Sequence, residues 1–144
     1  MVYSFPWYVP GIATAIAVLA AGIGALLFWK SKPPALIFTA VAVAALAGGL
    51  IAPMLALDRV VLSDEKLEQT TGFWFAPTVK GFRLADVDSI TIGTARDAKG
   101  REYEVWNVRL TGGQLKEIDP GDLWEMNDLD IIQRLEAKGI EVKR

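Results

Sequence analysis

Two long apolar stretches near the start of the chain set the strongest limit on its fold. Residues 11–29 and 35–57 form runs of 19 and 23 residues without a charged side chain. An α-helix rises 1.5 Å per residue and the hydrocarbon core of a bilayer is about 30 Å thick, so each run is long enough to cross a membrane. We therefore predict a transmembrane hairpin in residues 1–57, followed by an extramembrane domain in residues 58–144.

A soluble helical core and a cleaved signal peptide both fit these stretches less well than membrane spans do. Buried helices of a soluble protein rarely contain charge-free runs this long in a chain of only 144 residues. A cleaved signal peptide normally begins with a basic segment, but no Lys or Arg precedes the first run, and a second run follows it almost directly. The sequence therefore favours two antiparallel spans.

The segment between the two runs has the composition of a loop at a membrane surface. Lys30 and Lys32 are the only charged residues before Asp58, and a double proline at Pro33 and Pro34 follows them. Proline ends the first helix and suits the first position of the next one, while lysine side chains reach into water from the bilayer edge. Aromatic residues at both ends suit the headgroup layer. The predicted membrane-interface residues are Trp7, Tyr8, Trp29, Lys30 and Lys32.

Both runs carry small residues at spacings that place them on one helix face. In lipid, small side chains favour helix association because they let two backbones approach closely. The predicted helix-packing residues are Ala13, Ala17, Ala21, Gly24, Ala25, Ala40, Ala44, Gly48 and Gly49. Packing of the hairpin on itself is the simplest use of these residues, although two ridges per helix leave a face for a partner helix. The absence of ionisable residues within the runs argues against a transporter, a proton path or a channel.

The composition of residues 58–144 excludes several classes of function. This part holds 13 of the 15 basic residues and all 17 acidic ones, giving a net charge of −4, which is unfavourable for binding nucleic acid. The chain has no Cys and no His, so thiol nucleophiles, Cys/His zinc sites and His-based acid–base catalysis are excluded. Carboxylates such as Asp119 and Asp122 suit turns and lack the spacing of a calcium loop. We expect no enzyme activity, no catalytic residue, no metal site and no cofactor.

Short alternating segments in residues 58–118 predict five or six antiparallel strands, and one amphipathic helix is predicted over residues 127–138. Asn127 is a suitable N-cap for this helix, and Lys138-Gly139-Ile140 suggests a Schellman stop. The predicted fold class is a membrane α-helical hairpin plus an α+β domain. Its antiparallel β-sandwich or partly open barrel would carry one C-terminal helix.

The order of these parts resembles that of the bacterial pleckstrin-homology-like membrane proteins. The likeness lies in a two-span hairpin, the segment DRVVLSDEKLEQTTGFW, the strand FRLADVDSITI and the closing helix. The resemblance implies a strongly bent sandwich or barrel closed by the helix, and it implies no catalytic residue. One feature departs from lipid-binding pleckstrin-homology domains, which place basic residues in their first turn. Here Asp64 and Glu65 occupy that turn and would repel a phosphate.

The expected function is that of a non-catalytic accessory or scaffolding subunit that stabilises a larger membrane complex, respiratory or photosynthetic for example. The expected partners are membrane lipid and other integral membrane subunits, with Trp74 and Trp124 as possible partner contacts. The alternative is a free-standing, membrane-anchored pleckstrin-homology-like module that binds a peptide or a lipid surface. Native electrophoresis after gentle detergent extraction distinguishes the two.

The expected location is the bacterial inner (cytoplasmic) membrane. Because the hairpin loop holds two lysines and the ten-residue N-terminal tail holds none, the positive-inside rule favours a cytoplasmic loop and a periplasmic β domain. Arg59 and Lys66 flank the second span on the domain side and weigh against this orientation, as does the resemblance, since many such domains are cytoplasmic.

Overall fold

The computed structural model describes all 144 residues and divides them into two compact units. The first, here termed the β domain, contains Met1–Tyr3, Arg59–Thr70 and Val79–Arg144, and the second, termed the helical unit, contains Ser4–Asp58 and Thr71–Thr78. This division differs from the expected boundary between residues 57 and 58 in two places. The first three residues belong to the β domain, and the turn of a β-hairpin belongs to the helical unit.

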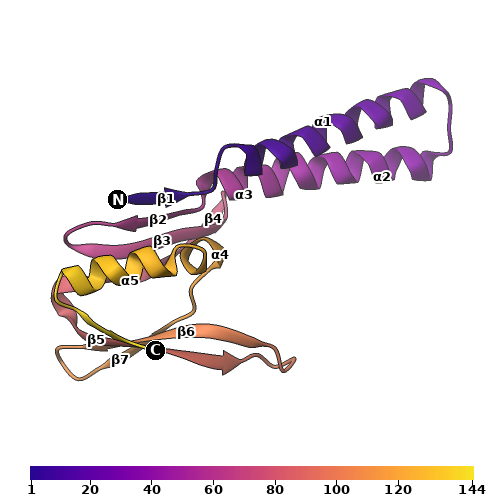
Figure 1. Cartoon of the computed structure of the whole chain (residues 1–144). Helices are drawn as coiled ribbons and strands as arrows, with labels where there is room; N and C mark the ends of the chain where they lie inside the picture. The colour runs from indigo at the N-terminus through magenta and orange to yellow at the C-terminus, as the bar shows by residue number, and fades with distance from the viewer. The chain divides into compact units, whose positions relative to one another are not determined.

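The helical unit is a hairpin of two long helical segments that run side by side in opposite directions (Figure 1). The first is α1 (Tyr8–Trp29), and the second extends from Pro34 to Leu57 and contains 24 residues. The second comprises α2 (Pro34–Ala45), the π-helix η1 (Leu46–Ile51) and α3 (Ala52–Leu57). Pro34 begins α2, where its missing N–H removes no helical hydrogen bond. The structure thus contains the two long apolar helices that the sequence predicts.

The π-helix η1 has a cause in the sequence. Pro53 lies in the first turn of α3, and a proline ring crowds the carbonyl four residues earlier, which here belongs to Gly49. Widening the helix relieves this crowding, and the N–H of Ala52 accordingly donates to the carbonyl of Ala47, five residues back. Since Pro53 has no N–H, the Gly49 carbonyl also lacks the donor that a regular α-helix would supply.

The strands form two four-stranded sheets. In spatial order, the first contains β1 (Val2–Ser4), β2 (Arg59–Leu62), β3 (Lys66–Phe73) and β4 (Ala76–Arg83), and the second contains β7 (Leu115–Ile118), β6 (Glu102–Leu110), β5 (Val87–Arg96) and β8 (Glu141–Lys143). Pairing is antiparallel between β2 and β3 and along β5–β6–β7, whereas β8 pairs with β5 in parallel. The 3-10 turn η2 (Leu84–Asp86) connects the two sheets.

Two short helices complete the β domain, α4 (Asp122–Glu125) and α5 (Asp128–Ala137). The end of α5 confirms the predicted Schellman stop. Gly139 has a left-handed φ of +84°, and the N–H of Ile140 donates to the carbonyl of Leu135. Asn127 is the N-cap residue of α5, as predicted, but its side-chain amide donates to the Leu123 carbonyl, back toward α4, and makes no cap bond with α5.

The core of the β domain is formed by large side chains from both sheets, from α4 and from α5. Trp106 on β6 and Trp124 on α4 meet edge to face, with ring centroids 5.1 Å apart, and both are fully buried. Leu67, Ile90 and Ile131 are fully buried as well. Burial of this much apolar surface holds the two sheets and the C-terminal helix together.

The β-rich domain with a C-terminal helix is confirmed, and it forms two sheets. Two strands were not predicted. One is β1, in which Tyr3 is only 8% exposed and its hydroxyl donates to Asp130 on α5. The terminal strand β8 follows the Schellman turn and lies at the edge of the second sheet.

Candidate functional site

The contact between the two helical segments is made by small residues. Ala13, Ala20 and Gly24 on α1 are buried, as are Ala47 and Ala52 on the second segment. A Cβ atom added to Gly48 would lie 2.9 Å from the Cβ of Ala17, so the backbones approach closely at this point. Close approach of this kind is how helices associate in lipid.

The predicted helix-packing residues separate into two groups. Ala13, Ala17, Gly24, Ala40, Ala44 and Gly48 are buried or half-buried, whereas Ala21, Ala25 and Gly49 are exposed. The line of buried and half-buried residues on α1 runs through positions 13, 17, 20 and 24, so it also includes Ala20. The exposed pair Ala21 and Ala25 is not used by the hairpin itself.

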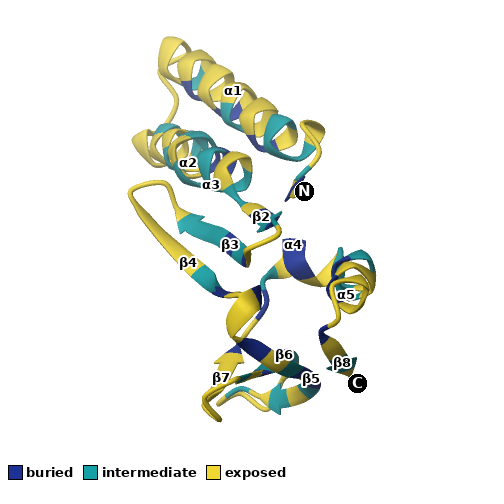
Figure 2. Cartoon of the chain, turned by 90° about the vertical axis from the view of Figure 1, so that its left-hand side faces the viewer, coloured by how far each residue is buried: buried dark blue, intermediate teal, exposed yellow.

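Large apolar side chains cover the outside of the hairpin. Within the most apolar part of each helix, only 17% of the residues in α1 and 11% of those in the second segment are buried. Figure 2 shows much of both helices in the exposed colour. Ile12, Ile16, Leu19, Ile23, Phe38 and Val41 are among the exposed residues. A core helix of a soluble protein would be mostly buried by its own chain, and these two helices are not.

The predicted interface residues lie at the two ends of the hairpin. Trp7 is 85% exposed and packs edge to face with Tyr8 at the start of α1. At the other end, Trp29, Lys30 and Lys32 are all exposed around the loop. The loop closes through a left-handed conformation at Ser31, whose φ is +50°.

A third element joins the helical unit at the end where α1 begins and α3 ends. It is the turn between β3 and β4, residues 72–76, here termed the aromatic tip. The indole N–H of Trp74 donates to the main-chain carbonyl of Gly49 at 3.0 Å. The hydroxyl of Thr71, just before the tip, donates to the carboxylate of Asp58 at 3.2 Å. The sequence signal that could have located this contact is Pro53, which deprives Gly49 of its helical donor.

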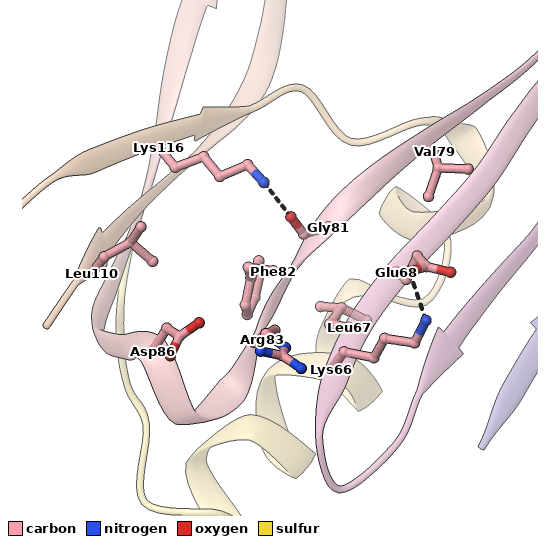
Figure 3. Close-up of a pocket in the computed structure, with 10 residues that line it drawn as sticks. All are labelled: Lys66, Leu67, Glu68, Val79, Gly81, Phe82, Arg83, Asp86, Leu110 and Lys116. Atoms are coloured by element: carbon pink, nitrogen blue, oxygen red, sulfur yellow. Dashed lines mark hydrogen bonds and ion pairs between the residues drawn. The ribbon is translucent and has the colours of Figure 1, made fainter.

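A cleft of about 350 Å³ in the β domain lies between the edge strands β4 and β7 (Figure 3). Gly81 is required there, since a Cβ atom on it would lie 2.2 Å from the carbonyl oxygen of Leu67. The ammonium of Lys116 on β7 donates to the carbonyl of Gly81 on β4 and thereby links the two sheets. Main-chain groups and side chains of both charges line the cleft, which suits an extended peptide better than a phosphate.

The charges of the β domain are mostly paired. Arg96 binds Glu102, Arg101 binds Asp97 at 2.9 Å, and Lys80 donates to the main-chain carbonyl of Asp119. Each of these basic side chains therefore has an oxygen partner close by. In the first turn, Asp64 forms an ion pair with Lys138, and the hydrogen bond from this lysine lowers the pKa of the carboxylate.

Two ionisable side chains have pKa values that are raised by their burial. Burial, followed by the hydrogen bond to Asp130, raises the pKa of Tyr3 to about 12. Desolvation, followed by the neighbouring carboxylate of Glu104, raises the pKa of Glu125. The candidate acidic residues Asp119 and Asp122 are exposed, and the structure shows no cluster of acidic side chains that could hold a metal ion.

Of the two tryptophans considered as partner contacts, only Trp74 is accessible. Trp74 is 55% exposed on the aromatic tip, whereas Trp124 is 0% exposed. The interpretation of Trp124 as a partner contact is therefore wrong. Its position after the turn Asp119-Pro120-Gly121 places it on the short helix α4, which was not predicted and which directs the indole into the core against Trp106.

Comparison with protein-family models, with curated proteins and with solved structures finds no match to this chain.

Proposed function

We propose that the chain is an integral membrane protein whose helical hairpin crosses the bacterial inner membrane twice. The observation that carries this proposal is the apolar outer surface of the hairpin, which is exposed along both helices while small residues fill the contact between them. Lengths of 22 and 24 residues correspond to about 33 and 36 Å, enough to span the hydrocarbon core. A signal sequence would not account for a second helix packed along its whole length against the first.

The β domain, in this proposal, is a non-catalytic docking module of the pleckstrin-homology-like type, and the chain is an accessory subunit of a larger complex. Support comes from the exposed small residues Ala21 and Ala25, which lie beyond the contact within the hairpin and suit a partner helix. The complex would be a membrane assembly of respiratory or photosynthetic type.

The topology of the chain supports one part of the expected orientation. Strand β1 precedes α1 and strand β2 follows α3, and the two strands are neighbours in one sheet. The main-chain N–H of Leu62 donates to the Met1 carbonyl at 2.9 Å. If the hairpin crosses a membrane, its N-terminal tail and the β domain therefore lie on the same side. With Lys30 and Lys32 in the opposite loop, we propose the periplasmic side for the domain.

Gentle detergent extraction followed by native electrophoresis tests the subunit proposal. We expect the chain to migrate in stoichiometric association with other membrane proteins. Replacing Ala21 and Ala25 together by Leu should release it, because bulky side chains prevent close helix approach. Val18→Leu, at an exposed position that is already large, is the matched control and should not release it. A chain that extracts only as a monomer or homo-oligomer contradicts the subunit proposal.

A second candidate function is a free-standing module that binds a peptide, and the cleft between β4 and β7 is the observation that favours it. Edge strands present unpaired main-chain groups, to which an extended peptide can add as a further strand. In that case the native gel would show the chain without a stoichiometric partner. Substitution of Gly81 would not be a useful probe of this function, since any side chain there displaces β3.

A further inference from the structure

The aromatic tip has a composition that conflicts with its place in the fold. The two residues at the turn itself are Trp74 and Phe75, where hairpins usually place Asn, Asp or Gly. Gly72, with φ of +97°, provides the left-handed conformation that the connection needs. Departures from local turn chemistry concentrate at functional positions, so the two aromatic residues require a reason outside the turn.

The apolar character of the tip extends into both strands. From Gln69 to Val79 the chain carries no charged residue, and Glu68 and Lys80 flank this interval. The rings of Phe73 and Phe75 stack with centroids 5.3 Å apart, and Trp74 meets Phe75 edge to face at 5.4 Å. The three rings thus form one apolar cluster, and each remains 45–60% exposed.

The hydrogen bond from Trp74 to Gly49 fixes the depth of this cluster along the helices. The second helical segment is about 36 Å long, roughly 6 Å more than the hydrocarbon thickness. With Pro34 at the boundary on the loop side, the opposite boundary falls near Pro53. Gly49, four residues before Pro53, then lies about 6 Å inside it. An indole bonded to this carbonyl lies just inside the hydrocarbon boundary, next to the interfacial layer in which tryptophan is enriched.

We propose that the aromatic tip is a third membrane-embedded element, inserted into the interfacial layer of the bilayer beside η1 and α3. The proposal rests on the membrane hairpin proposed above and adds lipid as the ligand of the tip. Lipid is favoured over a protein partner because the tip is bound to a helix whose neighbouring outer face is itself apolar. The helix supplies to the indole N–H a carbonyl whose α-helical donor position is occupied by Pro53, and Phe73 and Phe75 are left for the acyl chains.

The position of the tip can be measured with a fluorophore on a single cysteine, because the chain has no native cysteine. The full-length variants Phe75→Cys, Ile12→Cys and Lys99→Cys would each be labelled with bimane and reconstituted into phosphatidylcholine vesicles. Ile12 is exposed near the start of α1, and Lys99 is exposed in the turn between β5 and β6. Quenching by lipids that carry a nitroxide at a shallow position is compared with quenching by aqueous iodide.

We expect the label at position 75 to be quenched by the nitroxide lipid nearly as strongly as the label at position 12. This quenching should be several-fold stronger than at position 99, and iodide should show the reverse order. The proposal is overturned if position 75 behaves like position 99. It is also overturned if position 75 is protected from both quenchers, which would mean that protein covers the tip. Failure of lipid quenching at position 12 would instead contradict the membrane hairpin itself.

The role of the indole N–H is tested by Trp74→Phe in the Phe75→Cys background. Phenylalanine keeps an aromatic ring but cannot donate to Gly49, so we expect lipid quenching at position 75 to decrease. Trp7→Phe, at an exposed tryptophan whose indole N–H donates to no helix carbonyl, is the matched control and should leave the quenching unchanged. Equal quenching in the two variants would overturn the anchoring role of Trp74.

Discussion

The helical unit and the β domain bury opposite kinds of residues. In the β domain the largest side chains, Trp106 and Trp124 among them, are inside, and the charged residues lie at the surface. In the helical unit alanine and glycine are inside, and Leu, Ile and Phe side chains cover the outside. The first pattern suits a domain in water, and the second suits helices in lipid. Water drives large apolar groups inward, whereas between helices in lipid the favourable contact comes from close backbone approach.

This contrast has a consequence for mutations, because the same substitution should have different effects in the two units. The stability that a side chain in the β-domain core contributes depends on the apolar area it buries, and a side chain on the outside of the hairpin buries much less against protein. The most informative experiments therefore compare one residue type in both places.

The largest difference is expected for isoleucine. Ile131 on α5 is fully buried and Ile23 on α1 is exposed. Ile131→Ala should lower the free energy of unfolding of the β domain by about 2 to 5 kcal/mol, because it removes buried methyl groups and leaves a cavity. Ile23→Ala should change it by less than about 0.5 kcal/mol. Urea unfolding of the full-length protein in detergent, followed by tryptophan fluorescence, measures both, and equal losses would contradict the comparison.

An effect of roughly 2 to 3 kcal/mol is expected at high pH, from Tyr3. The pKa of this phenol is raised from 10.0 to about 12, chiefly by burial and then by its bond to Asp130, so the folded state favours the protonated form. The stabilisation is present in full below pH 10 and is lost as the pH rises through about 12.

We expect the wild-type β domain to lose this stability between pH 10 and pH 12, and Tyr3→Phe to lack that step. Tyr8→Phe, at an exposed tyrosine of the helical unit, should retain the wild-type behaviour. Thermal unfolding across this pH range provides the measurement. If Tyr3→Phe shows the same alkaline loss as the wild type, Tyr3 does not belong to the β-domain core.

A smaller effect is expected at the contact between the helices. A Cβ atom at Gly48 would approach Ala17 to 2.9 Å, whereas one at Gly22 would meet nothing within 4 Å. Gly48→Ala should weaken hairpin packing by about 1 to 2 kcal/mol through overpacking. Gly22→Ala should be neutral or slightly stabilising, because alanine is the better helix former. Faster hydrogen exchange in α1 for Gly48→Ala alone is the expected readout, and equal exchange in both variants would show that this contact is absent.

Much of the fold could be predicted because its signals are local. Charge-free runs with Pro33 and Pro34 between them predict the two helices, and a glycine after Lys138 predicts the end of α5. Strands with alternating side chains, such as β6, are recognised for the same reason. In each case a few consecutive residues carry the whole signal.

The missed features depend on partners far away in the sequence. Strand β1 consists of three residues whose pairing with β2 is formed across the whole hairpin, and nothing in Val2–Ser4 distinguishes it from a membrane-surface tail. The burial of Trp124 likewise depends on α4 and Trp106. At the candidate site, the interface aromatics follow from local composition, while the bond from Trp74 to Gly49 joins residues that are 25 positions apart.

The central claim is that the outside of the hairpin faces lipid while the β domain faces water, and cysteine accessibility tests it most directly. Leu19→Cys on the outside of α1, Ser31→Cys in the hairpin loop and Lys99→Cys in the β domain would be treated with a membrane-impermeant maleimide. In intact cells with a permeabilised outer membrane, the proposed orientation predicts labelling at position 99 and protection at position 31. In open membranes both should react, while position 19 stays unlabelled until the protein is denatured, because a thiol in lipid is neither accessible nor ionised. Labelling of position 19 in open membranes, at the rate of position 99, would contradict the account.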